Sequence, residues 1–143
     1  MAVEAVKKVF FNSPVSLIEI DLFVGATYMP CDTVGTLAHA VQKQFNITNA
    51  KCFTIDSACS SFVNALEIVD CYFANKIATK ALIIVSENNS IYNDCSDSNS
   101  GFLWGDGTTA LVGSNERFFD NDLEVLDIRS EERRVGKECT IQC

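Results

Sequence analysis

Cys59 stands where a strand-like segment meets a helix-like one, a position that suits a nucleophile. The run Asp56-Ser-Ala-Cys-Ser-Ser61 joins a strand candidate at 50–56 to a long apolar segment of helical length at 57–75. Free backbone N–H groups and the positive end of a helix dipole stabilise a thiolate at such a junction. The same N–H groups can hold the oxyanion that forms when the sulfur attacks a thioester carbonyl. The neighbouring residues are small and leave space for a substrate. A cysteine in such a turn is more commonly structural, so the residues alone leave both interpretations open.

The other residues able to do chemistry form weaker patterns. His39 is the only histidine and lies in a predicted helix at 34–45, where a surface or packing role is expected. Asp106 lies between two glycines, but no Lys follows as a phosphate-binding loop requires, and the next residues are strand-like. We therefore expect a turn aspartate there. Trp104 is expected to fill space in the core.

The cysteine pattern argues against both a disulfide framework and a metal site. The seven cysteines, at positions 31, 52, 59, 71, 95, 139 and 143, are odd in number and include no CxxC pair. Because the N-terminus lacks the order of charge, apolar run and small residues of a signal peptide, reduced thiols are expected. The only histidine, His39, has no partner ligands at the spacing of a zinc site, so no metal is predicted.

The composition is typical of one folded domain. Of 143 residues, 48% are hydrophobic and 21% are charged, which favours a packed core over disorder. The net charge of −8 argues against nucleic acids and anionic membranes as partners. The aliphatic run at 81–85 is far too short to span a bilayer, which takes about 20 apolar residues. A cytoplasmic protein is therefore expected.

Helix-like and strand-like segments alternate along most of the chain. Helical patterns cover 1–11, 34–45 and 57–75, strands without alternation are predicted at 21–26 and 80–86, and a further strand is predicted at 50–56. Two more strands are predicted at 101–113 and 123–128, paired as a hairpin through the acidic loop 115–122. Strands that are apolar on both faces and separated by helices indicate an α/β fold, with a mostly parallel sheet between helical layers.

Two regions do not fit a self-contained domain. The helical segment 60–75 is apolar around most of its circumference, which is typical of a helix covered on two sides, and the chain is too short to supply the second cover. The segment 129–143 is highly charged and carries four of the eleven basic residues. It is either a solvated, disordered tail or a non-native, vector-derived or read-through sequence. We therefore predict a partial domain at 1–128 and a tail at 129–143.

The Cys59 turn and three other segments together resemble one family. Asp56-Ser-Ala-Cys-Ser-Ser-Phe62 is similar to the nucleophile segment of the thiolase-like condensing enzymes, most closely the 3-oxoacyl-[acyl-carrier-protein] synthase III group. The other segments follow in the family's order and at its spacings: Asp21-Leu-Phe-Val-Gly-Ala-Thr27, Ala81-Leu-Ile-Ile-Val-Ser-Glu87 and Phe102-Leu-Trp-Gly-Asp-Gly-Thr-Thr-Ala-Leu-Val112. They resemble the strand before the substrate-entry loop, the strand after the nucleophile helix and the glycine-rich strand. The resemblance covers 1–113.

The resemblance implies a fold, a reaction and partners. The fold would be one α/β half of a layered αβαβα thiolase-like architecture with a mixed, mostly parallel sheet, and the chain would be an incomplete N-terminal part of the enzyme. Cys59 would accept an acyl group from acyl-CoA, because a thiol exchanges readily with a thioester. Malonyl-acyl carrier protein would then lose CO₂ and attack the acyl group in a Claisen condensation of fatty acid or related biosynthesis. No cofactor is implied. The expected partners are acyl-CoA, acyl carrier protein and a second copy paired near the strand at 50–56.

Departures from the family limit this interpretation. The family's His and Asn for condensation lie in a C-terminal half and match nothing here, so the chain alone is not expected to condense. Ser98 stands where many members have an Arg that helps to hold CoA, and Val34 stands where members place a bulky residue near the acyl pocket. The acyl donor and the cofactor-binding residues therefore stay open. Two alternatives remain: a non-catalytic thiolase-like partner subunit, and a cysteine hydrolase, for which only His39 could be the base.

Overall fold

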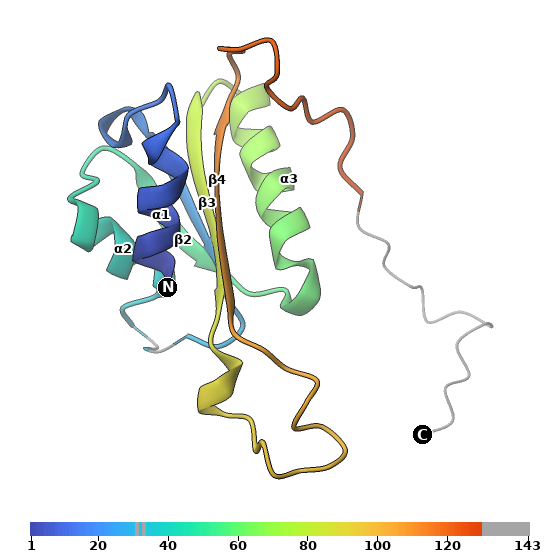
Figure 1. The fold of residues 1–143 in the computed structure, drawn as a ribbon. Helices are drawn as coiled ribbons and strands as arrows, with labels where there is room; N and C mark the ends of the chain where they lie inside the picture. Colours follow the sequence, from blue (N-terminus) through green and yellow to red (C-terminus); the bar gives the residue numbers. More distant parts are fainter. Residues whose placement is uncertain (31, 33, 130–143) are drawn as a thin grey trace.

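The computed structural model describes residues 1–30, 32 and 34–129, which form a sheet covered by helices on both faces (Figure 1). The sheet has four strands in the order β2-β1-β3-β4. They are β1 (Leu22–Ala26), β2 (Lys51–Ile55), β3 (Lys80–Glu87) and β4 (Gly107–Ser114). β1 pairs in parallel with both β2 and β3, and β4 pairs antiparallel with β3. The predicted α/β class with a mixed, mostly parallel sheet is confirmed.

Helices α1 (Ala2–Phe11) and α2 (Leu37–Phe45) cover one face of the sheet, and α3 (Ser61–Ala74) covers the other. Successive side chains of a strand point to opposite faces. Phe23 accordingly packs in the cluster under α1 and α2, whereas Leu22 and Val24 pack under α3. All five residues of β1 are buried because this strand is covered on both faces and flanked on both edges.

Helix α2 lies directly on β1 because Gly25 has no side chain. A Cβ at Gly25 would lie 2.9 Å from the Ala38 Cβ and 3.0 Å from the Ala38 nitrogen. Thr54 on β2 fixes the same turn of α2, since its Oγ1 accepts a hydrogen bond from the Ala38 backbone at 3.1 Å. The helix begins at Leu37 and not at the predicted position 34, with Thr36 as its N-cap residue.

The predicted hairpin between 101–113 and 123–128 is wrong. β4 pairs with β3 along its whole length, from Ser114 opposite Lys80 to Gly107 opposite Glu87. This pairing uses the free edge of β3, and 123–128 forms no strand. The predicted strand 101–113 is present only from Gly107. The prediction that Trp104 fills the core is also wrong, because its side chain is 53% exposed.

The apolar helix α3 is buried on its inner side and partly open on its outer side. Ala65 and Val69 are buried against the sheet, whereas Phe62 is 39% exposed. Three residues of the helix line a shallow groove together with the segment 125–128: Glu67, Asp70 and Cys71. The predicted tail begins at Arg129, and its remainder, 130–143, lies outside the described residues.

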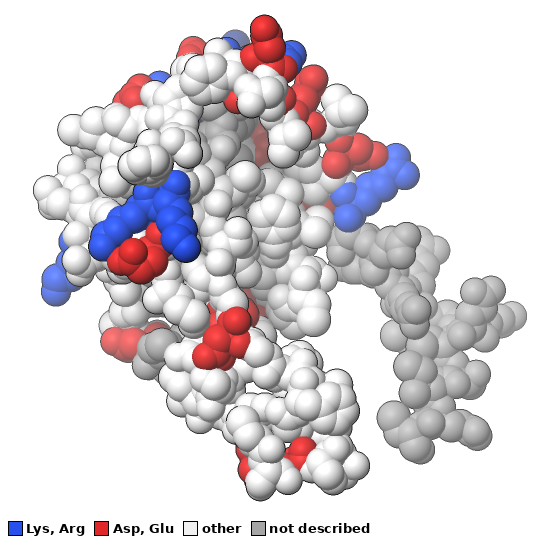
Figure 2. All heavy atoms as spheres, viewed as in Figure 1, with Lys and Arg blue, Asp and Glu red and all other residues white. Residues whose placement is uncertain are grey.

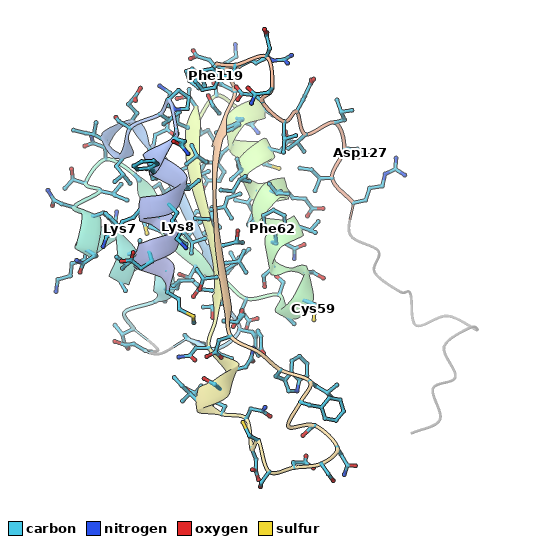
Figure 3. All side chains as sticks on the ribbon, in the orientation of Figure 1. Lys7, Lys8, Cys59, Phe62, Phe119 and Asp127 are labelled. Carbon is cyan, nitrogen blue, oxygen red and sulfur yellow. The ribbon has the colours of Figure 1, made fainter. Side chains whose placement is uncertain are left out.

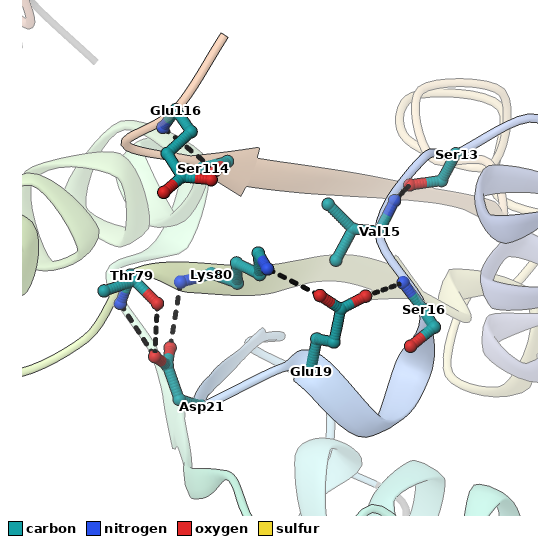
Figure 4. Close-up of polar contacts among 9 residues, drawn as sticks. All are labelled: Ser13, Val15, Ser16, Glu19, Asp21, Thr79, Lys80, Ser114 and Glu116. Carbon is teal, nitrogen blue, oxygen red and sulfur yellow. Dashed lines mark hydrogen bonds and ion pairs between the residues drawn. The ribbon is translucent and has the colours of Figure 1, made fainter. Parts of the chain in front are cut away.

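Carboxylates tie the strands together at the amino end of the parallel sheet (Figure 4). Asp21 accepts three hydrogen bonds, from the Thr79 nitrogen at 2.8 Å, the Thr79 Oγ1 at 2.9 Å and the Lys80 nitrogen at 3.0 Å. Glu19 pairs with the Lys80 Nζ at 2.6 Å and accepts from the Ser16 nitrogen at 2.8 Å. The hydrogen bonds from Lys80 and then Ser16 lower the pKa of Glu19 to about 2. This end of the sheet is held by direct polar contacts.

Candidate active site

Cys59 lies at the opposite, carboxyl end of the parallel strands. It occupies the short 3₁₀ helix η2 (Ala58–Ser60), which connects the end of β2 to the start of α3. Its side chain is exposed. Figure 3 shows Cys59 at the lower end of α3, at the end of the sheet from which the loop between β3 and β4 extends. The predicted junction of strand, cysteine and helix is therefore confirmed.

The backbone immediately before Cys59 has an uncommon conformation. Ala58 has a φ of 48°, in the left-handed region, where a residue with a Cβ pays a penalty of roughly 1–2 kcal/mol. The Asp56 Oδ1 accepts a hydrogen bond from the Ala58 nitrogen at 3.1 Å and so holds this peptide. Strained backbone of this kind persists only where its surroundings fix it, and it is enriched at functional sites.

Ser61 fixes the same turn from inside the protein. Ser61 is buried, with only 2% of its surface exposed. The Ser61 Oγ accepts from the Ser57 nitrogen at 2.9 Å and donates to the Ala58 carbonyl at 2.8 Å. One hydroxyl therefore closes the turn on both sides of the left-handed residue. The neighbouring Ser60, the N-cap residue of α3, makes no side-chain capping hydrogen bond.

The ends of the three parallel strands are joined beside this turn. The Thr27 nitrogen, just after β1, donates to the carbonyl of Ile55 at the end of β2 at 3.2 Å. The Thr27 Oγ1 donates to the Glu87 carboxylate at 3.1 Å, and the Tyr28 nitrogen donates to the other oxygen of Glu87 at 3.0 Å. Glu87 was not among the predicted site residues. A signal was present, because Thr27 and Glu87 each end a segment that resembles the family, and parallel strands bring such ends together.

The glycine-rich turn is tied to the loop after β3. The Asp106 carboxylate accepts from the Ser90 nitrogen at 2.8 Å and from the Ser90 Oγ at 2.6 Å. These hydrogen bonds, from the Ser90 side chain first and then its backbone, lower the pKa of Asp106. Asn89 donates to the Gly105 carbonyl at 2.8 Å and also hydrogen-bonds the Tyr28 hydroxyl. Asp106 therefore has a structural role in the loop just before β4, where it holds Ser90.

The other candidate residues lie apart from this arrangement. His39 is exposed on α2, where its Nδ1 lies 2.7 Å from the Thr36 Oγ1. Because α2 and α3 cover opposite faces of the sheet, the fold does not pair His39 with Cys59. Cys52 is half-buried on β2, and its burial raises the pKa of that thiol to about 11. Val34 and Ser98, the two departures from the family, are both exposed.

The described residues show neither a group of metal ligands nor a membrane-spanning helix. Within 1–30, 32 and 34–129, no three His, Cys, Asp or Glu side chains are grouped so as to hold a metal ion. Over the same ranges, none of the helices combines the length and the apolar character needed to cross a membrane. The face shown in Figure 2 is largely uncharged, with scattered acidic side chains and few basic ones, two of which lie together beside an acidic side chain.

The fold and the cysteine turn are those of a thiolase-like protein, and comparison with known proteins identifies the family. The model of the 3-oxoacyl-[acyl-carrier-protein (ACP)] synthase III family matches residues 53–130, which is more than half of the chain. The chain therefore belongs to this family, as the sequence resemblance predicts. The match begins within β2 and includes the Cys59 turn, α3, β3 and β4.

Individual relatives agree with this assignment. Beta-ketoacyl-[acyl-carrier-protein] synthase III of Clostridium botulinum (strain 657 / Type Ba4) is 38% identical over 117 residues, which are 82% of this chain and 36% of that protein. The Anaplasma marginale (strain St. Maries) protein of the same name is 41% identical over 112 residues, or 78% of this chain and 35% of the relative. This chain thus spans little more than a third of these relatives.

Solved structures give the same result for the fold. The crystal structure of 3-oxoacyl-[acyl-carrier-protein] synthase III from Aquifex aeolicus VF5 superposes with a TM-score of 0.77 at 32% identity. The superposition covers 82% of this chain and 38% of that one. The synthase III of Thermus thermophilus gives a TM-score of 0.75 at 26% identity, over 81% of this chain and 36% of the other. The thiolase-like fold is confirmed.

Proposed function

We propose that Cys59 is the acyl-accepting nucleophile of a β-ketoacyl-[acyl-carrier-protein] synthase III-type acyltransferase. The observation that carries the proposal is the position of Cys59, exposed between the carboxyl end of β2 and the start of α3, in a chain of this family. The left-handed Ala58 turns the chain sharply from strand to helix and leaves the sulfur at the surface. A nucleophile presented in this way is open to an incoming thioester.

The first half of the proposed reaction is an acyl transfer between two sulfurs. The Cys59 thiolate attacks the carbonyl carbon of acyl-CoA and forms a new C–S bond, and the bond to the CoA sulfur breaks. CoA leaves as its thiolate and takes up a proton. The energy of the thioester is retained, because one thioester replaces another. Backbone N–H groups of the first turn of α3 are suited to stabilise the oxyanion that forms between these steps.

The second half of the proposed reaction needs groups beyond those that this chain brings together. Malonyl-acyl carrier protein loses CO₂, and the resulting carbanion forms a C–C bond with the acyl carbon as the Cys59 sulfur leaves. The family uses a His and an Asn for this step. His39, the only histidine of the chain, lies on the helix that covers the other face of the sheet. We therefore assign only the acylation step to residues of this chain. The same placement of His39 gives the cysteine hydrolase alternative no support.

The proposed partners follow from the reaction and from the sheet. Acyl-CoA and acyl carrier protein are the proposed substrates, with no cofactor, no nucleic acid and no membrane. We also propose a homodimer through β2, because β2 is an edge strand of the described sheet and an edge strand offers unpaired backbone groups to a second copy. The proposal also includes a cytoplasmic location, a partial thiolase-like N-terminal domain at 1–128 and a non-native or disordered tail at 129–143.

The test of this proposal is covalent acylation measured by intact-protein mass spectrometry. The chain is exposed briefly to acetyl-CoA, and the mass gain and the CoA released are quantified together. We expect one acetyl group per chain and an equal amount of CoA. Cys59→Ala should abolish both signals, while Cys71→Ala, which removes another exposed thiol, should leave them unchanged. An unchanged mass gain in Cys59→Ala would refute the assignment.

A further inference from the structure

The buried hydroxyl of Ser61 makes two hydrogen bonds to the backbone just before Cys59. It lies two residues after the cysteine, at the first position of α3, and belongs to a residue that is 2% exposed. It is one of three described polar residues that are buried, with Thr27 and Asn89 as the others. A buried hydroxyl is costly unless both its donor and its acceptor capacities are used. Ser61 uses both within the cysteine turn.

Each of the two hydrogen bonds of Ser61 acts on a different side of the left-handed residue. The bond from the Ser57 nitrogen, at 2.9 Å, fixes the chain before Ala58, and the bond to the Ala58 carbonyl, at 2.8 Å, fixes the peptide that leads into Cys59. A glycine would adopt the left-handed conformation without a steric penalty, but residue 58 is an alanine. Its conformation therefore depends on the two hydrogen bonds of Ser61 and on the one that Asp56 accepts.

We infer that Ser61 is a positioning residue for Cys59, which acts by holding the Ala58–Cys59 peptide in the left-handed turn that presents the sulfur at the start of α3. Its effect on acyl transfer rests on the proposed function of Cys59. Its effect on the geometry of the turn does not. Without the hydroxyl, the Ser57 nitrogen loses its side-chain acceptor and the Ala58 carbonyl loses one donor. The Ala58–Cys59 peptide is then free to adopt other conformations, and the position of the sulfur at the start of α3 becomes less fixed.

The experiment compares Ser61→Ala with Ser60→Ala, the same substitution one residue earlier at a side chain that makes no capping hydrogen bond. The rate of Cys59 acylation is measured as a function of acetyl-CoA concentration. We expect Ser61→Ala to lower the saturating rate on the order of tenfold, because small displacements of reacting atoms from their productive geometry carry penalties of that size or larger. The concentration for half-saturation should stay the same, and Ser60→Ala should behave as the unchanged protein. Equal saturating rates in Ser61→Ala and Ser60→Ala would overturn the inference.

A second readout separates positioning from loss of structure and from failure of the proposed function. Iodoacetamide alkylates cysteines without any acyl-CoA, and peptide mass spectrometry resolves each thiol. Ser61→Ala should slow alkylation at Cys59 and leave the exposed Cys71 and Cys95 unaffected, while the half-buried Cys52 stays protected. Faster labelling of Cys52 would show a general loosening and would contradict a positioning role. If the unchanged protein accepted no acyl group, the proposed function would fail, and the alkylation comparison would still decide the role of Ser61.

A pair of nearly isosteric variants covers the case in which Ser61→Ala does not fold. Ser61→Thr retains the hydroxyl and Ser61→Val replaces it with a methyl group, so the two variants fill similar volumes. We expect faster Cys59 alkylation in Ser61→Thr than in Ser61→Val. Equal rates in this pair would overturn the inference.

Discussion

The two ends of the parallel sheet are held together by similar contacts but serve different purposes. At the amino end, Asp21 accepts hydrogen bonds from Thr79 and Lys80. At the carboxyl end, Glu87 accepts hydrogen bonds from Thr27 and Tyr28. In both places a carboxylate fixes the backbone of a segment that is distant in sequence: Asp21 lies just before β1, and Glu87 is the last residue of β3. The carboxyl end also carries Cys59 in its strand–helix turn, whereas the exposed Cys71 lies in the last turn of α3, towards the amino end.

The residues with left-handed backbone also differ between the two ends of the sheet. Asn46 and Lys76, which lie towards the amino end of the sheet, follow the last turns of α2 and α3, where a left-handed residue is a common way to end a helix. Ala58, at the carboxyl end, lies inside the tight turn before Cys59. The contacts at the amino end therefore stabilise the fold. At the carboxyl end, the left-handed turn before the proposed nucleophile lowers the free energy of unfolding, and the rest of the fold offsets that cost.

Removing the carboxylate at the carboxyl end should affect both stability and chemistry. Glu87→Ala leaves the buried Thr27 hydroxyl and the Tyr28 nitrogen without their acceptor, which should lower the free energy of unfolding by about 1–3 kcal/mol. Because Thr27 also holds the carbonyl of Ile55, the Cys59 turn should loosen and acyl transfer should slow, by roughly tenfold for each 1.4 kcal/mol of lost transition-state stabilisation. Urea unfolding and acylation kinetics on the same samples measure both effects.

The matched substitution at the amino end should affect stability alone. Asp21→Ala removes the acceptor of three hydrogen bonds and should lower the free energy of unfolding by about 1–2 kcal/mol. The rate of acyl transfer per folded molecule should not change, because these contacts lie at the far end of the strands from Cys59. A loss of acyl transfer as large as that in Glu87→Ala would remove the distinction between the two ends.

Relaxing the left-handed turn at Ala58 should raise the free energy of unfolding while it slows acylation. Ala58→Gly relieves the left-handed strain and should raise the free energy of unfolding by up to about 1 kcal/mol. A more flexible turn should nevertheless slow acylation of Cys59. Lys76→Gly is the control, since it relieves a left-handed residue at a helix end and should leave acylation unchanged. Faster acylation in Ala58→Gly would contradict the claim that the left-handed turn positions Cys59 for acyl transfer.

The smallest expected effect is a pH dependence from the amino end. The pKa of Glu19 is lowered from its ordinary value of 4.5 to about 2 by Lys80 and Ser16. A carboxyl group with a depressed pKa in the folded state stabilises the protein above its unfolded pKa and loses that contribution as the pH falls towards the folded value. The thermal unfolding midpoint should therefore fall between pH 4.5 and about 2, and it should fall less in Glu19→Gln. Identical pH profiles would contradict the pairing with Lys80.

Much of this molecule could be predicted from the sequence because its signals are local. The apolar runs at 21–26 and 80–86 indicate the largely buried strands β1 and β3, and the residues around Cys59 place it at a strand–helix junction. The strand expected at 50–56 is the partly exposed edge strand β2. These features depend on composition and spacing within short segments, which the sequence displays directly. The family resemblance of the Cys59 turn is confirmed for the same reason.

The features that could not be predicted depend on contacts between distant segments. The segment 123–128 has strand-like composition, but β4 pairs with the edge of β3. Among the described residues, 123–128 therefore pairs with no strand. The Glu87–Thr27 contact was missed although both residues end strand-like segments, because the contact itself depends on the parallel register of β1 and β3. The role of Ser61 depends on a left-handed φ at Ala58, and an alanine gives no local sign of that conformation.

The most direct test of the central claim is the distribution of acyl groups among exposed thiols. The chain is treated briefly with acetyl-CoA, and peptide mass spectrometry measures the acylated fraction at Cys59, Cys71 and Cys95, which are all exposed. If the strand–helix turn makes a cysteine an acyl acceptor, Cys59 will carry the acyl group, while Cys71 and Cys95 will stay at background. Equal acylation of the three thiols would contradict the account.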